Sequence, residues 1–257
     1  SAEIAFVAPR AADCSSLLAR LRSILAGQAV DAAVVPAQGR RKKLLLADMD
    51  STMIEQECVD ELAARLDLRA EVSAITERAM RGEIAFGPAL RARVALLKGL
   101  PVGIVDELLE SRITLSPGAG ILVRTMRANG AYSCLVSGGF TLFSSRIAER
   151  LGFDEHRANR LVVRDGRLTG EVEEPILGQE AKRDALIELR DRLGVSRREV
   201  LAVGDGANDL GMLAEAGLGV AYRAKPAIAA AAELRIDHAD LVSLLYLQGY
   251  RRRELVE

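Results

Sequence analysis

Residues 44–52, with the sequence LLLADMDST, decide both the fold and the chemistry of this chain. Leu44–Ala47 is a short unbroken apolar run, which predicts a strand that is buried on both faces. The run ends at Asp48, and Asp50 follows on the same loop. One carboxylate of such a pair can attack phosphorus while the other moves a proton. Taken alone, the pair is equally consistent with Asp50 and Ser51 capping the next helix.

The chain after residue 119 alternates between apolar strands and amphipathic helices, which predicts an α/β fold: a doubly wound, Rossmann-like parallel sheet with helices on both faces. Between residues 56 and 110 the apolar positions recur at helical spacing, so we expect a helical insertion of roughly three to five helices after the first core strand. The expected later elements are helices at 119–129, 141–151, 179–193 and 209–216, strands at 131–136, 199–203 and 218–221, and a hairpin at 160–176 turning at Asp165-Gly166.

Residues 1–43 predict a small strand–helix–strand unit, with apolar strands at 4–7 and 32–35. The basic cluster at residues 40–43 is interpreted as a solvated linker rather than a nucleic-acid patch. Over the 257 residues, 35 Lys and Arg stand against 36 Asp and Glu, and the formal net charge of −1 does not favour nucleic-acid binding.

Cysteine and histidine usage is sparse. The three cysteines lie far apart and form no CxxC pair, and there are two histidines, so we expect neither a disulfide framework nor a His/Cys zinc site. No apolar run approaches the length of about 18 residues that a membrane helix needs, and no leader pattern is visible. We therefore expect no membrane partner and a cytoplasmic location.

Three expected strands end in polar residues: Asp48, Ser137 and Asp205. Ligands of open α/β sheets bind beyond the carboxyl ends of the strands, so these distant segments are expected to form one site. The hydroxyl of Ser137 and the backbone N–H groups of Gly138 and Gly139 can hold an anion. The same serine and glycines are also consistent with an ordinary strand-to-helix turn.

The segment at residues 204–209, GDGAND, places two carboxylates beside glycines, which suits a hard cation such as Mg²⁺. The alternative is a turn rich in Asp and Asn. Lys182 lies near the start of the expected helix at 179–193, where its ammonium could neutralise phosphate oxygens or the attacking carboxylate. Most helical lysines are simply exposed. Taken together, these groups meet the requirements of phosphoryl transfer.

These segments resemble, in order and spacing, the motifs of the haloacid dehalogenase (HAD) superfamily. Residues 48–52 are similar to its first motif (DxDxT), Ser137 to its second, Lys182 to its third and residues 204–209 to its fourth. Within the superfamily, the stretches LLLADMDSTMIEQECVDELA, LVSGGF and VGDGANDLGML resemble the SerB-type phosphoserine phosphatases of bacteria. The resemblance implies an HAD core at 44–54 and 116–257, a helical C1 cap at 55–115, and a partial βαβ segment at 1–43, a reduced or trimmed ACT-like domain.

The resemblance implies Mg²⁺-dependent hydrolysis of O-phospho-L-serine to L-serine and phosphate, the last step of L-serine biosynthesis. Asp48 would be the nucleophile that forms an aspartyl-phosphate, and Asp50 the general acid and base. The remaining implied roles are metal binding by Asp48, Asp205 and the backbone carbonyl of Asp50, phosphate binding by Ser137, Gly138 and Lys182, substrate binding by Asn208, and support by Asp209.

The resemblance also implies that Glu57 and Arg93 hold the ammonium and carboxylate of the substrate, which their charges suit. Met80 and Phe86 match apolar cap residues that exclude water. Without the resemblance, the first two are consistent with solvated helix faces and the last two with core packing. A phosphotransferase or a phosphatase of another small phosphomonoester stays open, as does a non-catalytic amino-acid-binding module supported by residues 1–43 alone. A homodimer is also left open.

Overall fold

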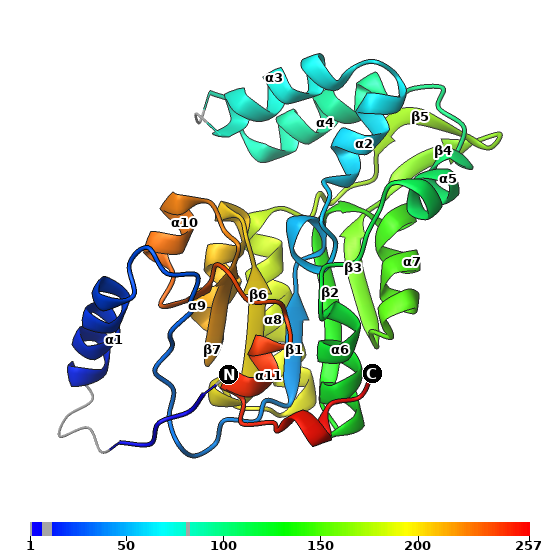
Figure 1. Ribbon diagram of the computed structural model, residues 1–257. Coiled ribbons are helices and arrows are strands. Elements are labelled where there is room, and N and C mark those ends of the chain that lie inside the picture. The colour runs from blue at the N-terminus through cyan, green and yellow to red at the C-terminus, as the bar shows by residue number, and fades with distance from the viewer. Residues whose placement is uncertain (1, 7–11, 81–82) are drawn as a thin grey trace.

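A computed structural model describes residues 2–6, 12–80 and 83–257 of the chain. Its centre is a parallel six-stranded sheet in the order β3-β2-β1-β6-β7-β8 (Figure 1). The strands are β1 (Leu44–Ala47), β2 (Tyr132–Phe140), β3 (Glu155–Asn159), β6 (Val200–Gly204), β7 (Leu218–Tyr222) and β8 (Leu234–Ile236). The predicted α/β class and the parallel sheet are confirmed.

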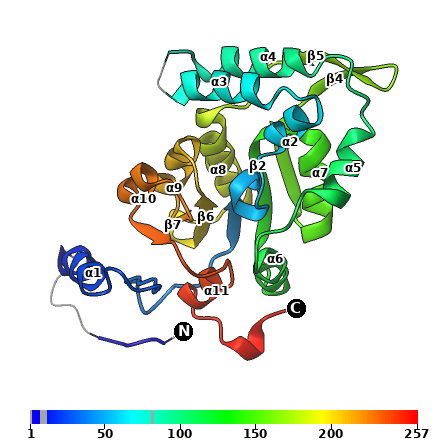
Figure 2. The same cartoon turned by 45° about the horizontal axis from the view of Figure 1, so that its top comes forward.

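Helices cover both faces of this sheet, and the two layers can be followed in Figures 1 and 2. Leu45 and Ala47 of β1 join one apolar core, whereas Leu44 and Leu46 join the other. The unbroken apolar run of β1 therefore reflects burial on both faces. Helices of the first layer are α6 (Ala119–Ala128), α7 (Thr141–Leu151) and α11 (Ser243–Leu247), and those of the second are α8 (Gln179–Leu193) and α9 (Leu210–Glu215).

The core helices and the hairpin agree with their sequence-based predictions to within a few residues. The hairpin consists of β4 (Leu161–Arg164) and β5 (Arg167–Val172), and Asp165 and Gly166 at its turn both have positive φ, at 51° and 71°. Two positive φ angles are typical of a two-residue hairpin turn. The sequence pattern did not indicate β3 or β8. β8 follows α10 (Pro226–Ala231), a helix that contains most of the alanine run at residues 229–232.

Four helices of the described residues lie above the carboxyl ends of the strands (Figure 1): α2 (Cys58–Arg65), α3 (Arg69–Met80), α4 (Phe86–Leu96) and α5 (Ile104–Ser111). We call α2–α5 the cap helices. The β4–β5 hairpin packs against the cap helices through two backbone hydrogen bonds of Leu168. Its N–H donates to the Leu100 carbonyl at 2.9 Å, and its carbonyl accepts from the Gly99 N–H at 2.8 Å. The expected cap range of 55–115 does not include this hairpin.

The strands predicted within residues 1–43 are not formed, and that prediction is wrong for the described residues. Residues 2–6 and 30–36 are extended without strand pairing, and α1 (Ala12–Ile24) is the helix between them; Val7 lies outside the described residues. The second segment docks on the core through Asp31 instead. Its carboxylate accepts the N–H groups of Asp237 and Ala239, each at 2.8 Å. An apolar run becomes a strand only when it pairs with a neighbouring strand, and the described parts of these two segments pair with none.

The basic cluster at 40–43 is solvated only in part, because Arg41 and Lys43 are exposed whereas Arg40 and Lys42 are half-buried. The Arg40 guanidinium donates to the carbonyls of Leu247 at 2.9 Å and Tyr246 at 2.8 Å. Lys43 pairs with Glu199 at 2.6 Å. The cluster therefore fastens the chain that enters β1 to segments far along the sequence. Within the described residues, none of the helices combines the length and apolar character that a bilayer crossing requires.

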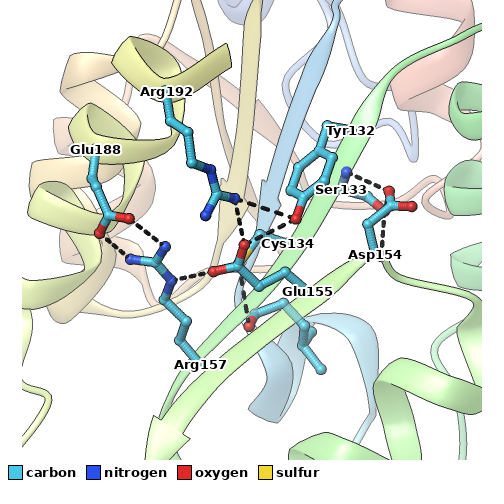
Figure 3. Close-up of polar contacts among 9 residues, drawn as sticks. Tyr132, Ser133, Cys134, Asp154, Glu155, Arg157, Glu188 and Arg192 are labelled. Carbon is cyan, nitrogen blue, oxygen red and sulfur yellow. Dashed lines mark hydrogen bonds and ion pairs between the residues drawn. The ribbon is translucent and has the colours of Figure 1, made fainter.

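An ion-pair network holds the edge strand β3 against α8 (Figure 3). Arg157 donates to both carboxylate oxygens of Glu188, at 2.6 and 2.9 Å, and to Glu155 at 2.6 Å. Glu155 also accepts from Arg192 at 2.5 Å and from the Tyr132 hydroxyl at 2.9 Å. Glu155 and Arg157 are two residues apart on a strand, so both point to the face that α8 covers.

Because three donors meet at one carboxylate, we expect Glu155→Ala to lower the free energy of unfolding by about 1–3 kcal/mol. Burial raises the pKa of Glu155, but the hydrogen bonds from Arg192, Arg157 and Tyr132 outweigh burial and lower it overall. A lowered pKa means that this stabilisation is present at neutral pH and is lost as the pH falls through the folded-state value. Urea unfolding at pH 7 and in acid measures both effects, with the exposed Glu149→Ala as the control. Equal stability of the two variants at pH 7 would contradict the prediction.

Candidate active site

The three polar strand ends meet at one edge of the sheet, directly beneath the cap helices. Ala47 of β1 pairs with Leu135 of β2 on one side and with Val203 of β6 on the other. The residues that follow, including Asp48, therefore lie between the ends of the two neighbouring strands. This is the geometry that the sheet rule predicts.

Lys182 is a buried site residue rather than an exposed helical lysine. Its side chain is 1% exposed, and its Nζ lies 2.7 Å from Asp48 Oδ1 and 2.7 Å from Asp209 Oδ1. Burial alone would lower the pKa of Lys182, but the two carboxylates outweigh burial and raise it. The side chain therefore stays an ammonium, positioned against the carboxylate at the end of β1.

Asp209 shapes the loop that follows β6. Its Oδ2 accepts the backbone N–H groups of Asp205 at 3.1 Å and Gly206 at 2.9 Å. A Cβ atom at Gly204 would lie 2.4 Å from Asp209 Cγ, so only glycine fits there. Asn208 lies in the same turn, with its Oδ1 against Gly206. These contacts hold both the Asp205 carboxylate and Lys182 in fixed positions.

Carboxylate oxygens of Asp48, Asp205 and Asp209 lie within 4.8 Å of one another, which is close enough for one cation to contact all three. Burial, together with the negative charge of Asp209, raises the pKa of Asp205 to about 6. Thr52 donates to Asp205 at 3.0 Å and orients it. Oxygen donors of this kind suit a divalent metal ion such as Mg²⁺. The residues present therefore fit a divalent metal.

The Asp50 side chain binds groups outside this cluster of carboxylates. Its Oδ1 accepts the N–H of Cys58, the first residue of α2, at 2.9 Å, and its Oδ2 accepts from the Ser137 hydroxyl at 3.2 Å. The two interpretations of Asp50 are thus compatible, because it binds the start of the next helix and also faces the site. Burial raises the pKa of Asp50, as suits a group that donates a proton.

Glu57 and Arg93 both belong to the cap side of the site. Glu57 accepts from the Ser51 hydroxyl at 2.6 Å and keeps solvent contact. The surrounding protein and the charge of Asp50 nevertheless raise the pKa of Glu57 to about 7. Burial lowers the pKa of Arg93, while the negative charges of Asp60 and Glu57 act in the opposite direction. Arg93 is therefore within electrostatic reach of Glu57.

Phe86, at the start of α4, reaches down from the cap onto the glycines of the core. A Cβ atom at either Gly138 or Gly178 would lie 3.3 Å from an atom of the Phe86 ring. The ring thus covers the segment after Ser137. The side chain of Met80, the other expected cap residue, lies outside the described part of the structure.

Two residues that hold the site together, Cys58 and Asn159, were not among the residues predicted from the sequence. Cys58 contributes its backbone N–H to Asp50, a contact that the expected capping role of Asp50 could have indicated. Asn159, at the end of β3, donates to the Gly138 carbonyl at 2.9 Å. No pattern in the polar segment EHRAN singles it out before the strand is known.

Comparison with known proteins agrees with this geometry. A family model described as haloacid dehalogenase-like hydrolase matches residues 45–214, about two thirds of the chain. The chain belongs to the haloacid dehalogenase-like hydrolase family. The match contains all four motif segments and the cap helices.

Several curated relatives are phosphoserine phosphatases. The chain is 50% identical over 210 residues to one from Polaromonas, covering 80% of this chain and 89% of that one. It is 41% identical to one from Mycobacterium tuberculosis, covering 91% of this chain but 58% of that longer protein. A solved structure described as a phospho-aspartyl intermediate analogue of phosphoserine phosphatase aligns with a TM-score of 0.73 at 41% identity, covering 80% of this chain and 98% of that one.

Proposed function

We propose that this protein is a phosphatase that hydrolyses O-phospho-L-serine to L-serine and inorganic phosphate with the help of Mg²⁺. The observation that carries the proposal is the buried pair of Asp48 and Lys182, which lies at the same sheet edge as Asp50 and Ser137. The phosphoserine phosphatases at up to 50% identity support the substrate. As the last step of L-serine biosynthesis, the reaction would take place in the cytoplasm.

The proposed reaction has two displacements at phosphorus. First, a carboxylate oxygen of Asp48 attacks, the bond from phosphorus to the serine oxygen breaks, and Asp50 gives its proton to that leaving oxygen. Next, Asp50 takes a proton from water, the water oxygen attacks phosphorus, and the bond to Asp48 breaks. Splitting the hydrolysis in this way lowers each barrier. Lys182, Ser137 and the Gly138 N–H would hold the phosphate oxygens, whose charge changes most in the transition state.

Asp48, Asp205 and the backbone carbonyl of Asp50 would hold the Mg²⁺ ion, and Asp209 offers a further oxygen in the same cluster. When bound, Mg²⁺ neutralises the negative charge that the phosphate brings to these carboxylates. Asn208 would complete the phosphate side of the site from the neighbouring turn.

Selection of an amino acid would come from the cap. Glu57 would bind the substrate ammonium, and Arg93 would hold the α-carboxylate through its planar guanidinium. Phe86, and Met80 by its expected role, would exclude water above the phosphate.

Phosphate release from a panel of phosphomonoesters tests the proposal, with Mg²⁺ and with a chelator. The panel contains L-phosphoserine, D-phosphoserine, phosphothreonine, histidinol phosphate and a sugar phosphate. We expect strong preference for L-phosphoserine and loss of activity with the chelator. Equal rates on all substrates would remove the substrate assignment and keep the phosphatase, and added homoserine that accepts the phosphoryl group would indicate a phosphotransferase. Absence of release from every ester would overturn the proposal.

Glu57→Gln should raise KM for L-phosphoserine about 10- to 100-fold, because a hydrogen bond to a charged group contributes about 1.5–3 kcal/mol. Hydrolysis of p-nitrophenyl phosphate, which has no amino group, should change little. The exposed Glu71→Gln in α3 is the matched control. If both esters lose activity equally, Glu57 does not read the amino group.

The raised pKa of Glu57 predicts a pH effect on the same discrimination. As the pH falls through about 7, the carboxylate takes up a proton and no longer attracts the substrate ammonium. We therefore expect the ratio of kcat/KM for L-phosphoserine over p-nitrophenyl phosphate to fall on the acid side. Using the ratio cancels the titration of the phosphate that both substrates share. In Glu57→Gln the ratio should stay flat, and a fall of equal size there would contradict the assignment.

A further inference from the structure

Asn159 is a buried polar residue that the proposed reaction does not use. It ends β3, and the residue is 2% exposed. Its Nδ2 donates to the carbonyls of Gly138 at 2.9 Å and Leu177 at 3.1 Å, and its Oδ1 accepts the Leu177 N–H at 2.7 Å. The two bonds with Leu177 fix which end of the amide is which, so the Nδ2 group must face Gly138.

The Gly138 carbonyl needs such a partner because the strand pairing breaks there. Between β2 and β3 the register passes from Val136 opposite Arg157 directly to Phe140 opposite Asn159. Residues 137–139 therefore face a single residue of β3 and form a bulge. A bulge leaves backbone groups without a partner in the ladder, and buried groups of this kind are costly unless another group bonds them. The Asn159 side chain supplies that bond.

The peptide group that joins Gly138 to Gly139 is consequently held at both ends. Its carbonyl accepts from Asn159, and its N–H donates to Ser137 Oγ at 2.8 Å. Because that oxygen already accepts a hydrogen bond on this side, its own proton points elsewhere, and Asp50 Oδ2 lies at 3.2 Å to receive it. Ser137 is itself fully buried. A chain of hydrogen bonds thus runs from Asn159 through one peptide group to Ser137 and Asp50.

The ion pairs of Figure 3 hold the strand that carries Asn159. Glu155 and Arg157 bind α8 from one face of β3 (Figure 3). Asn159 is two residues further along the strand than Arg157, so strand alternation places it on the same face. Glu155 and Arg157 attach that face to α8, and Asn159 lies one step further toward the site. The amide is therefore presented from a fixed element rather than from a loop, which is what precise positioning requires.

We propose that Asn159 is a positioning residue for phosphoryl transfer: through the Gly138–Gly139 peptide it orients the Ser137 hydroxyl toward Asp50 and the phosphate. This role rests on the proposed phosphatase function, in which Ser137 holds the phosphate and Asp50 moves the proton. The hydrogen bonds of Asn159 would then keep the bulge at 137–139 in one conformation.

Asn159→Asp is the sharpest variant, because it keeps the shape and replaces the amide donors by a carboxylate that faces two carbonyl oxygens. We expect kcat for L-phosphoserine to fall about 10- to 100-fold, as is usual when a residue behind an active group is changed. KM should change less, because Glu57 and Arg93 are untouched. If circular dichroism shows that Asn159→Asp does not fold, Asn159→Ser replaces it, because the serine side chain is too short to reach the Gly138 carbonyl. Asn129→Asp is the matched control, since its Nδ2 donates to the Thr125 carbonyl at 2.8 Å, away from the site.

A double-mutant cycle with Ser137→Ala separates positioning from a general structural role. If Asn159 acts through the Ser137 hydroxyl, its substitution should cost about threefold or less once that hydroxyl is gone, because coupled residues are not additive. The same loss in both backgrounds would overturn the proposal, as would an Asn159 variant with full kcat. If the wild-type protein does not hydrolyse L-phosphoserine but hydrolyses p-nitrophenyl phosphate, the proposed substrate is wrong. The kcat values of the double-mutant cycle are then measured with p-nitrophenyl phosphate. The affinity for inorganic phosphate, measured by calorimetry in the same four proteins, gives the same comparison without turnover.

Discussion

We expect Asp48→Asn to abolish phosphate release from L-phosphoserine, with kcat lowered by about 10⁴-fold or more, the scale on which removal of a nucleophile acts. The amide cannot form the acyl phosphate that the proposed mechanism requires. The fold should survive, because Asn keeps the shape and retains an oxygen that can accept from Lys182, which lies 2.7 Å from Asp48 Oδ1. Phosphate release and thermal unfolding, measured together, test both statements.

A matched control and a trapped intermediate make this result specific. Asp184→Asn changes an exposed aspartate of α8, two positions beyond Lys182, and should leave turnover unchanged. Acid quenching of the wild-type protein during turnover, followed by peptide mass spectrometry, should locate a phosphoryl group on Asp48. Substantial activity in Asp48→Asn, or a phosphoryl group on another residue, would refute the mechanism.

The central strands could be predicted because burial on both faces leaves a simple mark, an apolar run that stops at a polar residue. Leu44–Ala47 is such a run, and all four of its residues are buried. The edge strand β3 has no such apolar run. It pairs with one neighbouring strand, and its polar sequence EHRAN supplies side chains that form ion pairs with α8. The apolar run at 32–35 gave the opposite error, because it predicted a strand where none forms. A strand needs a neighbouring strand to pair with, and no local sequence pattern reveals one.

The site shows the same division. Asp48, Ser137 and Asp205 could be placed together because one rule about parallel sheets joins the strand ends. The burial of Lys182 could not be read from its helix, because its partner Asp209 is 27 positions away and the contact depends on tertiary packing. Asn159 could not be found at all, since its function depends on a bulge in β2 that exists only once the two strands are paired.

The buried cation is the other position where a large effect is expected. Lys182→Met keeps the length and apolar stem of the side chain and removes the charge, which leaves Asp48 and Asp209 facing each other with 6% and 0% exposure. Removing one partner of a buried ion pair costs about 3–5 kcal/mol, so a loss of this size in the free energy of unfolding is expected in a chelator. Turnover should fall about 10²- to 10³-fold, as when a group that stabilises transition-state charge is lost.

Mg²⁺ should restore part of that stability, because a divalent cation among Asp48, Asp205 and Asp209 supplies the positive charge that the variant lacks. Urea unfolding with Mg²⁺ and with a chelator therefore tests the metal site without any measurement of activity. The exposed Lys98→Met is the control, and its stability should not depend on the metal more than that of the wild type. If Mg²⁺ stabilises Lys182→Met no more than it stabilises the wild-type protein, these three carboxylates are not the metal site. Greater stabilisation of the variant would mean that the Lys182 ammonium and the metal neutralise the same buried negative charge. Both cations would then be needed at the same time only when the phosphate adds its own negative charge to the site.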